Sequence, residues 1–429
     1  MNRIHFKKLT LALAMVAAST HGMAQTVPAT PLSTPEAILQ KLEAMSAEMA
    51  RLKAELQAMK EQQQVAQQET TQAITEQAKL LANPATVMTG YGEMNYNRPT
   101  RKNTDTQVDL RRVVIGMTHR FDEKTKFVGE FEWEHAVTSA GDKGEAAVEQ
   151  AYIEHELTPN LSLKAGLMLM PFGLLNEHHE PSSYYGVERN FVETAIIPST
   201  WREGGLMLMG KTDAGVSWST GLVTGFDLNK WSSTGADGKA SPLASIHQEG
   251  QLAKAKNISV LGSLDWRGTP GFLVGGSVFK GGAGHGQIAG ANPAVTLWDL
   301  HARWTPGKWD VSSVYAQGTI SDTANINASL IANPTLIPSK FGGTYVQAAY
   351  QAWSSGNYQL KPFARKEWVN TGMRFDATGF SLAPDAVEII STVGANFHIS
   401  QNVVFKADYQ RFALDPSRNR VDLGVGWSF

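Results

Sequence analysis

Apolar and polar residues alternate with a period of two along most of this chain, from about Ala85 to the C-terminus. The last run is the clearest, because Val421, Leu423 and Val425 alternate with polar residues or glycine up to Phe429. Further runs of this kind span residues 127–133, 161–169 and 403–409. Successive side chains of a strand point to opposite faces, so each run predicts a strand with one apolar and one polar face. Strands of about ten residues with this pattern are typical of transmembrane β-barrels.

The links between the predicted strands alternate in length. Short turns lie near residues 122–124, 158–160, 211–213, 267–270, 306–308, 354–356 and 400–402. Longer links lie near residues 97–106, 137–145, 171–203, 226–254, 281–293, 319–340, 370–384 and 413–418. Outer-membrane barrels have short turns on the periplasmic side and long loops outside. We therefore predict an all-β transmembrane barrel of about sixteen antiparallel strands over residues 85–429. A soluble β-sandwich is the alternative, but its loops would not alternate so regularly.

Residues 35–80 differ from the rest in composition and period. They are rich in Ala, Gln, Glu, Lys, Leu and Met and contain no glycine. Their apolar residues recur in steps of four and three, as in a heptad, at Ile38, Leu42, Met45, Met49, Leu52, Leu56 and Met59. Thr34 and Pro35 are typical of a helix start. We predict an N-terminal α-helical coiled-coil segment; a lone amphipathic helix packed on its own domain is the alternative.

The first residues have the features of an export signal. A basic stretch ending in Lys8 precedes an apolar run over residues 9–18, and the small residues Gly22 and Ala24 precede a cleavage site. The apolar run has about half of the ~20 residues that a membrane-spanning helix needs. The predicted parts of the chain are a signal peptide at 1–24, a periplasmic coiled-coil segment at 25–84 and the transmembrane β-barrel at 85–429.

Composition excludes several classes of protein. Lys and Arg total 38 and Asp and Glu total 40, so the net charge of −2 argues against a basic nucleic-acid-coating protein, and we expect no nucleic-acid partner. The absence of cysteine excludes disulfides, thiolate metal sites, iron–sulfur clusters and cysteine nucleophiles. No motif gathers a nucleophile with its base, so we expect no catalytic residues and no cofactor.

These features resemble the outer-membrane porins of Gram-negative bacteria. The segment Gly426–Phe429, in which Phe429 closes an alternating strand, resembles their assembly signal and implies the barrel-assembly machinery as a partner. More narrowly, the chain resembles the phosphate-selective porins O and P in the stretches 110–116, 149–154 and 163–166, the last running on to 171–173. The N-terminal heptads resemble the DcaP-like members of that family. The resemblance implies a homotrimer in outer-membrane lipid that passes small anionic solutes, with its coiled coil in the periplasm.

The link over residues 171–203 follows the fifth predicted strand and is the third external loop. In sixteen-stranded porins that loop folds inward, and the aromatic and apolar content of this one favours an ordered structure. We predict that it forms the pore constriction, through His178, His179, Tyr184, Tyr185, Arg189 and Arg202. An Ω-loop packed over the barrel mouth is the alternative. Either arginine could also pair with Glu188 or Glu203 and only hold the loop.

The run Glu177–Glu180 in this loop looks like a metal site, because it holds two glutamates and two histidines. Adjacent histidines in a loop seldom converge on one ion, however. We therefore expect no metal and interpret these residues as protonatable groups that face the pore, since rings of charged residues set the selectivity of channels.

Strand parity predicts which charged side chains face the inside of the barrel. If Val113 and Ile115 meet lipid, then Arg112 and Arg120 face water. The same argument places a basic set inside, namely Arg112, Arg120, Lys164, His301, Arg303, Lys361, Arg365 and Lys406. It also places an acidic set inside, namely Glu130, Glu132, Glu134, Asp299, Glu367, Glu388 and Asp408. The predicted lumen is thus mixed in sign. Separate positive and negative walls would still favour anions such as dicarboxylates.

The resemblance, added to these patterns, implies a porin, a passive water-filled channel for small hydrophilic solutes, with phosphate or dicarboxylates as the expected anions. Two alternatives remain at this point. One is a structural or adhesive outer-membrane barrel tethered by its coiled coil, and the other is a barrel-embedded hydrolase with a Ser–His pair on its outer rim.

Overall fold

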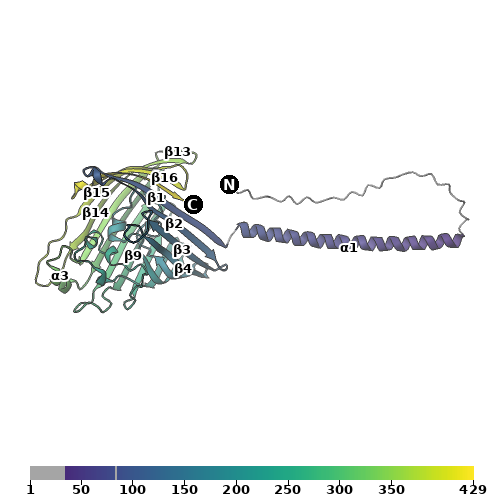
Figure 1. Ribbon diagram of the computed structural model, residues 1–429, viewed down its shortest axis with the longest axis horizontal. Helices are drawn as coiled ribbons and strands as arrows, with labels where there is room; N and C mark the ends of the chain where they lie inside the picture. Colours follow the sequence, from purple (N-terminus) through teal and green to yellow (C-terminus); the bar gives the residue numbers. More distant parts are fainter. Residues whose placement is uncertain (1–33, 83–84) are drawn as a thin grey trace. The chain divides into compact units, whose positions relative to one another are not determined.

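A computed structural model describes residues 34–82 and 85–429, so the predicted signal peptide lies outside the described residues. The chain divides at residues 83 and 84 into a helical unit and a barrel, and each is described by itself (Figure 1). The predicted fold class is confirmed: a closed antiparallel β-barrel preceded by a helix.

Helix α1 (Pro35–Ala82) begins at the predicted residue. The backbone N–H groups of Ala37 and Ile38 both donate to the carbonyl of Thr34, at 2.9 and 3.2 Å. The seven heptad residues from Ile38 to Met59 are each at least half exposed. None of the described helices is long and apolar enough to cross a membrane.

Strand bounds follow the predicted order. The first nine are β1 (Thr86–Pro99), β2 (Gln107–Arg120), β3 (Thr125–Glu134), β4 (Ala146–Thr158), β5 (Leu161–Leu169), β6 (Arg202–Lys211), β7 (Val216–Val223), β8 (Ser259–Trp266) and β9 (Phe272–Gly282). The others are β10 (Ala294–Trp304), β11 (Trp309–Ile320), β12 (Lys340–Tyr350), β13 (Trp353–Ser355), β14 (Tyr358–Arg374), β15 (Glu388–His398), β16 (Val403–Phe412) and β17 (Arg420–Ser428). Both β12 and the short β13 pair with β14, so they form one broken strand and the barrel wall has sixteen strands.

Each strand pairs with its neighbours in the sequence, and the last strand closes the barrel onto the first. Tyr91 of β1 lies opposite Ser428 of β17 in an antiparallel register. At the chain end, the backbone groups of Gly90 and Phe429 exchange two hydrogen bonds of 3.0 and 2.8 Å. Closure leaves no free sheet edge, which is the condition for a sheet to span a membrane.

The predicted alternation of short and long links is confirmed. Hydrogen bonds between neighbouring residues hold the short turns. For example, Asp122 Oδ1 accepts from the N–H groups of Lys124 and Thr125 at 2.8 Å each. Gly307 and Gly356 take positive φ angles of 63° and 57° in two other turns. The long links carry the remaining helices: η1 (Asn103–Asp105), η2 (Val192–Ile196), η3 (Leu228–Lys230), α2 (Asp237–Ala240), η4 (Ala244–Ile246), α3 (Ala324–Leu330) and η5 (Pro416–Arg418).

The two faces of the wall differ as the alternation predicts. Large apolar side chains are exposed on the outer face, for example Leu206, Val260 and Leu300, whereas buried polar groups such as Asp422 and Gln410 line the inner face. Exposed aromatic residues flank the short turns, at Phe121, Trp304, Trp309, Trp353 and Tyr358. An outer apolar band edged by aromatic residues is typical of transmembrane barrels.

Candidate functional site

The link between β5 and β6, residues 170–201, folds inside the barrel and contacts side chains of the inner wall. Tyr184 donates its hydroxyl hydrogen to Glu93 of β1 at 2.6 Å. The N–H of Val187 donates to Asp408 of β16, also at 2.6 Å. The N–H of Phe191 donates to Glu367 of β14 at 2.6 Å. The loop therefore extends from β5 and β6 across the barrel to β1, β14 and β16, as a pore-narrowing loop must.

Glu193, within η2, organises the loop. Its carboxylate accepts hydrogen bonds from the N–H groups of Leu174 and Leu175, at 2.5 and 2.8 Å. It also accepts from the amide of Asn190 at 2.7 Å and the hydroxyl of Tyr345 at 3.1 Å. Burial raises the pKa of the Glu193 carboxyl above its ordinary value, although these hydrogen bonds oppose the shift. One carboxylate thus joins both halves of the loop to β12.

An aromatic cluster fixes the C-terminal end of the loop. Trp201 is fully buried and packs against Phe172, Phe226 and Phe279, with ring centroids 5.0 to 5.2 Å apart. These rings come from the loop, from the link after β7 and from β9. This packing explains why a link of this length is ordered, since buried aromatic pairs add packing energy beyond the area they bury.

Two of the six predicted loop residues are adjacent histidines, and the structure separates them. His178 lines a cavity of about 450 Å³ at the short-turn end, beside Glu177, Asp265 and His301. His179 is buried on the other side of the loop, where its Nε2 lies 3.5 Å from Glu149 of β4. The run Glu177–Glu180 therefore does not converge on one point.

The two loop tyrosines contact acidic groups on opposite parts of the wall. Tyr184 donates to Glu93, and Lys406 lies over its ring with Nζ 3.5 Å from the centroid. Tyr185 donates to Asp310 at 3.1 Å. Burial raises the pKa of both tyrosine hydroxyls, so both remain protonated and act as donors.

The two loop arginines lie in different surroundings. Arg189 donates to the hydroxyl groups of Ser199 and Thr200, at 2.7 and 3.1 Å, and to the carbonyl of His179 at 2.9 Å. Arg202 forms an ion pair of 2.9 Å with Glu249, in the link between β7 and β8. Neither arginine pairs with Glu188 or Glu203. Arg189 therefore keeps a charge that only neutral acceptors contact, whereas a carboxylate compensates Arg202.

Most arginines on the inner wall are paired with carboxylates. Arg112 forms ion pairs with Glu93, Glu132 and Glu134, at 3.0, 2.8 and 3.2 Å. The others are Arg303 with Asp310 at 2.6 Å, Arg365 with Glu367 at 2.8 Å, and Arg420 with Asp422 at 2.9 Å. Glu132, Glu134 and Glu367 belong to the acidic set that parity places inside, whereas Glu93, Asp310 and Asp422 are further acidic partners, so the mixed sign of the lumen is largely a set of ion pairs.

The predicted lysines have weaker partners. Lys164 lies over the ring of Tyr152, 4.8 Å from its centroid, and Lys406 is buried with no hydrogen-bond partner for Nζ among the described residues. Lys361 is half-buried on the same face of β14 as Arg365. Arg120 is exposed at the end of β2, and Phe429 is exposed on the outer face.

A cavity of about 500 Å³ lies between the loop and the strands at the long-link end of the barrel. Five arginines line it: Arg111, Arg112, Arg189, Arg418 and Arg420. Three acidic residues accompany them, namely Glu93, Asp105 and Glu188. Guanidinium groups bind carboxylate and phosphate as planar forks and stay charged at any working pH. The cavity is thus suited to a small anion.

Arg111 and Glu149 are inner-wall residues that strand parity missed. Glu93 of β1 pairs with Arg112 of β2, and Met94 of β1 pairs with Leu110, so Arg111 is an extra residue in β2. Likewise, Glu130 of β3 pairs with Gln150 of β4 and Phe131 pairs with Val148, so Glu149 is an extra residue in β4. Each such β-bulge shifts the alternation by one residue. The sequence contains one sign of such a β-bulge, namely two consecutive arginines in an otherwise alternating strand.

Comparison with known proteins extends this picture. A family model described as phosphate-selective porin O and P matches residues 47–193, which include the inward-folded loop up to Glu193. An uncharacterized protein of Aquifex aeolicus (strain VF5) is 29% identical over 332 residues, covering 75% of this chain and 74% of that protein.

Solved structures share the barrel. OmpF of Salmonella typhi in complex with daunomycin matches with a TM-score of 0.54 and 14% identity, over 80% of this chain and 97% of that one. The anion-selective porin from Comamonas acidovorans matches with a TM-score of 0.50 and 11% identity, over 80% of this chain and 99% of that one. At these identities the similarity concerns the fold alone.

Proposed function

We propose that this chain is an outer-membrane porin that passes small anions through a passive, water-filled channel, because the family model of the phosphate-selective porins O and P matches residues 47–193. The predicted resemblance to that family is confirmed, and the coarser function, an outer-membrane channel for small solutes in a Gram-negative bacterium, follows from family and fold. A preference for anions goes beyond this coarser function and is part of the proposal. Phosphate and small dicarboxylates are the proposed solutes.

The arginine-lined cavity is the observation that carries this proposal. Its five arginines outnumber its three acidic residues. Arg189 projects from the loop into this cavity, and no carboxylate oxygen of the described residues lies within ion-pair distance of it. Inside a narrow, partly desolvated passage such a charge acts on a passing anion more strongly than in bulk water. The paired arginines would contribute less, because their fields are partly cancelled.

We also propose that the protein is a homotrimer, assembled in the outer membrane by the barrel-assembly machinery with Phe429 in the recognised C-terminal strand. Strand β1 begins at the short-turn end, since Thr86 pairs with His119 just before the turn at Asp122. Short turns face the periplasm in outer-membrane barrels. The coiled-coil segment would then lie in the periplasm, where its exposed heptad residues would pack against the same residues of the other protomers.

Liposome swelling tests whether the barrel conducts small solutes. Purified full-length protein is reconstituted into liposomes, which are diluted into isosmotic solutions of a pentose or of a large oligosaccharide. We expect rapid swelling in the pentose and none in the oligosaccharide, because the inward loop narrows the passage. Equal swelling in both would contradict a constriction. No swelling in either, with folded barrels in the liposomes, would instead favour the adhesive or hydrolase alternatives.

A further inference from the structure

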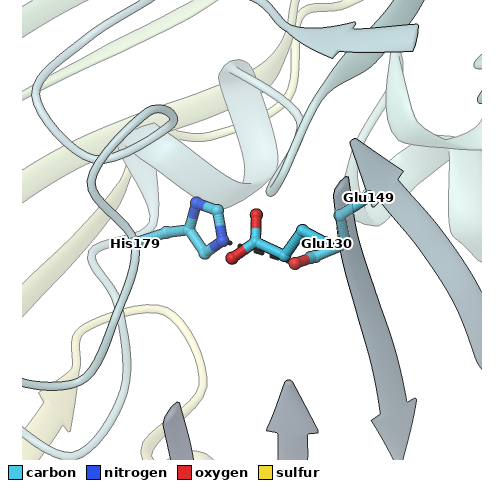
Figure 2. A group of neighbouring side chains, drawn as sticks. All are labelled: Glu130, Glu149 and His179. Atoms are coloured by element: carbon cyan, nitrogen blue, oxygen red, sulfur yellow. Dashed lines mark ion pairs between the residues drawn. The ribbon is translucent and has the colours of Figure 1, made fainter. Parts of the chain in front are cut away.

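Three side chains with metal-binding atoms meet at one point on the inner wall (Figure 2). Glu130 comes from β3, Glu149 from β4 and His179 from the inward-folded loop. One ligand atom of each lies within 4.8 Å of the other two. His179 Nε2 and Glu149 Oε2 are 3.5 Å apart. The group therefore joins the loop to two neighbouring strands.

The backbone of β4 aims Glu149 at this point. Unbroken alternation from Tyr152 through Gln150 would turn Glu149 outward and Val148 inward. The β-bulge reverses this, so that Glu149 is fully buried inside while Val148 is 40% exposed on the outer face. Bulges in barrels commonly re-aim a side chain next to a functional site.

His179 turns its Nε2 toward the two carboxylates. Its Nδ1 lies 3.0 Å from the carbonyl oxygen of Asn176. A carbonyl only accepts, so Nδ1 carries the hydrogen, and in the neutral ring the lone pair lies on Nε2. This Nε2 is buried and has no hydrogen-bond partner among the described residues. Histidine ligands of metals are commonly oriented by such a bond from the other ring nitrogen to a backbone carbonyl.

Each of the two carboxylates accepts a hydrogen bond from a neighbouring side chain of the wall. Tyr91 donates to Glu149 Oε2 at 3.3 Å, and the amide of Gln150 donates to Glu130 Oε2 at 2.7 Å. Glu149 Oε1 is buried without a hydrogen-bond partner in the described part of the chain. A buried carboxylate oxygen without a hydrogen-bond donor is costly, and a metal cation bound between it and the imidazole nitrogen would compensate that cost.

We propose that Glu130, Glu149 and His179 bind a divalent transition-metal ion that ties the inward-folded loop to the barrel wall. One imidazole and two carboxylates suit Zn²⁺ or a related first-row ion, whereas Mg²⁺ and Ca²⁺ prefer oxygen ligands alone. Metal–ligand distances of about 2.0–2.2 Å would draw the three groups closer, and the two glutamate side chains supply that movement. Glu130 is partly exposed, which leaves a coordination position for water.

Metal binding to the purified, tag-free protein tests the proposal, with ZnCl₂ as the probe. Full-length protein in detergent is dialysed to equilibrium against Zn²⁺, and bound metal is measured by mass spectrometry. We expect one Zn²⁺ per protomer and no comparable binding of Ca²⁺. Absence of stoichiometric Zn²⁺ would overturn the proposal and leave an imidazolium–carboxylate ion pair at this point. Equal binding of Ca²⁺ would overturn the assignment to a transition metal.

Matched variants distinguish this site from general binding to acidic groups. Zn²⁺ affinity should fall by more than about tenfold in His179→Gln and in Glu149→Gln, because loss of even an outer-shell partner has an effect of that size. His178→Gln is the control, because His178 lies on the other side of the loop. This variant should bind Zn²⁺ as the unchanged protein does. Heat-modifiable electrophoretic migration verifies that each variant is folded, and either variant alone decides the outcome. Unchanged Zn²⁺ binding in either folded variant would contradict the site.

Discussion

Individual charges in this barrel differ in effect because their partners differ. Arg112 is surrounded by three carboxylates within 3.2 Å, and Arg365 is paired with Glu367, so both contribute little net field to the passage. Arg189 contacts only hydroxyl groups and a carbonyl. The sequence predicts Arg189 and Arg202 as equivalent loop residues. What separates them is Glu249, which is distant in sequence and reaches Arg202 only in the folded chain.

Replacing Arg189 by Gln should reduce the preference for anions. The loss is about 1 kcal/mol, the interaction of two unit charges about 4 Å apart in water, which corresponds to roughly a fivefold lower anion-to-cation permeability ratio. The reversal potential of single channels in a salt gradient measures this ratio. The double variant Arg202→Gln/Glu249→Gln is the matched control and should leave the ratio nearly unchanged, because it removes a positive and a negative charge together. If this double variant alters the ratio as much as Arg189→Gln, pairing is not what distinguishes the two arginines.

Regular alternation makes the strands of this chain predictable from the sequence. The interruptions of this alternation are not predictable in the same way. The lengths of the links and the order of the strands follow from short-range patterns, because each turn is built from adjacent residues. A β-bulge depends on the register with a neighbouring strand, and Arg111 and Glu149 are placed by two of them. The inward path of the loop depends on partners such as Glu93 and Asp408, far away in the sequence. Such contacts have no local signature.

Removing residues 25–84 should leave a conducting barrel. The barrel closes through β1 and β17 without the helix, and the compact unit that contains it begins at Pro84. We expect the same single-channel conductance and an oligomer that dissociates at a lower temperature, because the exposed heptad residues would no longer tether the protomers. Conductance steps and the dissociation temperature in electrophoresis measure the two effects. Folded barrels without any channel activity would contradict this account.

At the scale of the whole barrel, the inner arginines are largely ion-paired and one loop divides the interior. One cavity opens at the long-link end and is lined by arginines, while another lies at the short-turn end beside His178 and Asp265. A solute that crosses the membrane must pass the loop that lies between them. Under the proposed function, the barrel supplies the passage and the loop supplies the selection.

Single-channel conductance of the purified protein in a planar bilayer, under a salt gradient, tests this account most directly. We expect insertions in three equal conductance steps and a reversal potential whose sign shows that anions are more permeant than cations. A cation-favouring reversal potential would contradict the proposal that the arginine-lined cavity selects the solute, and the absence of any conductance from folded barrels would contradict the channel itself.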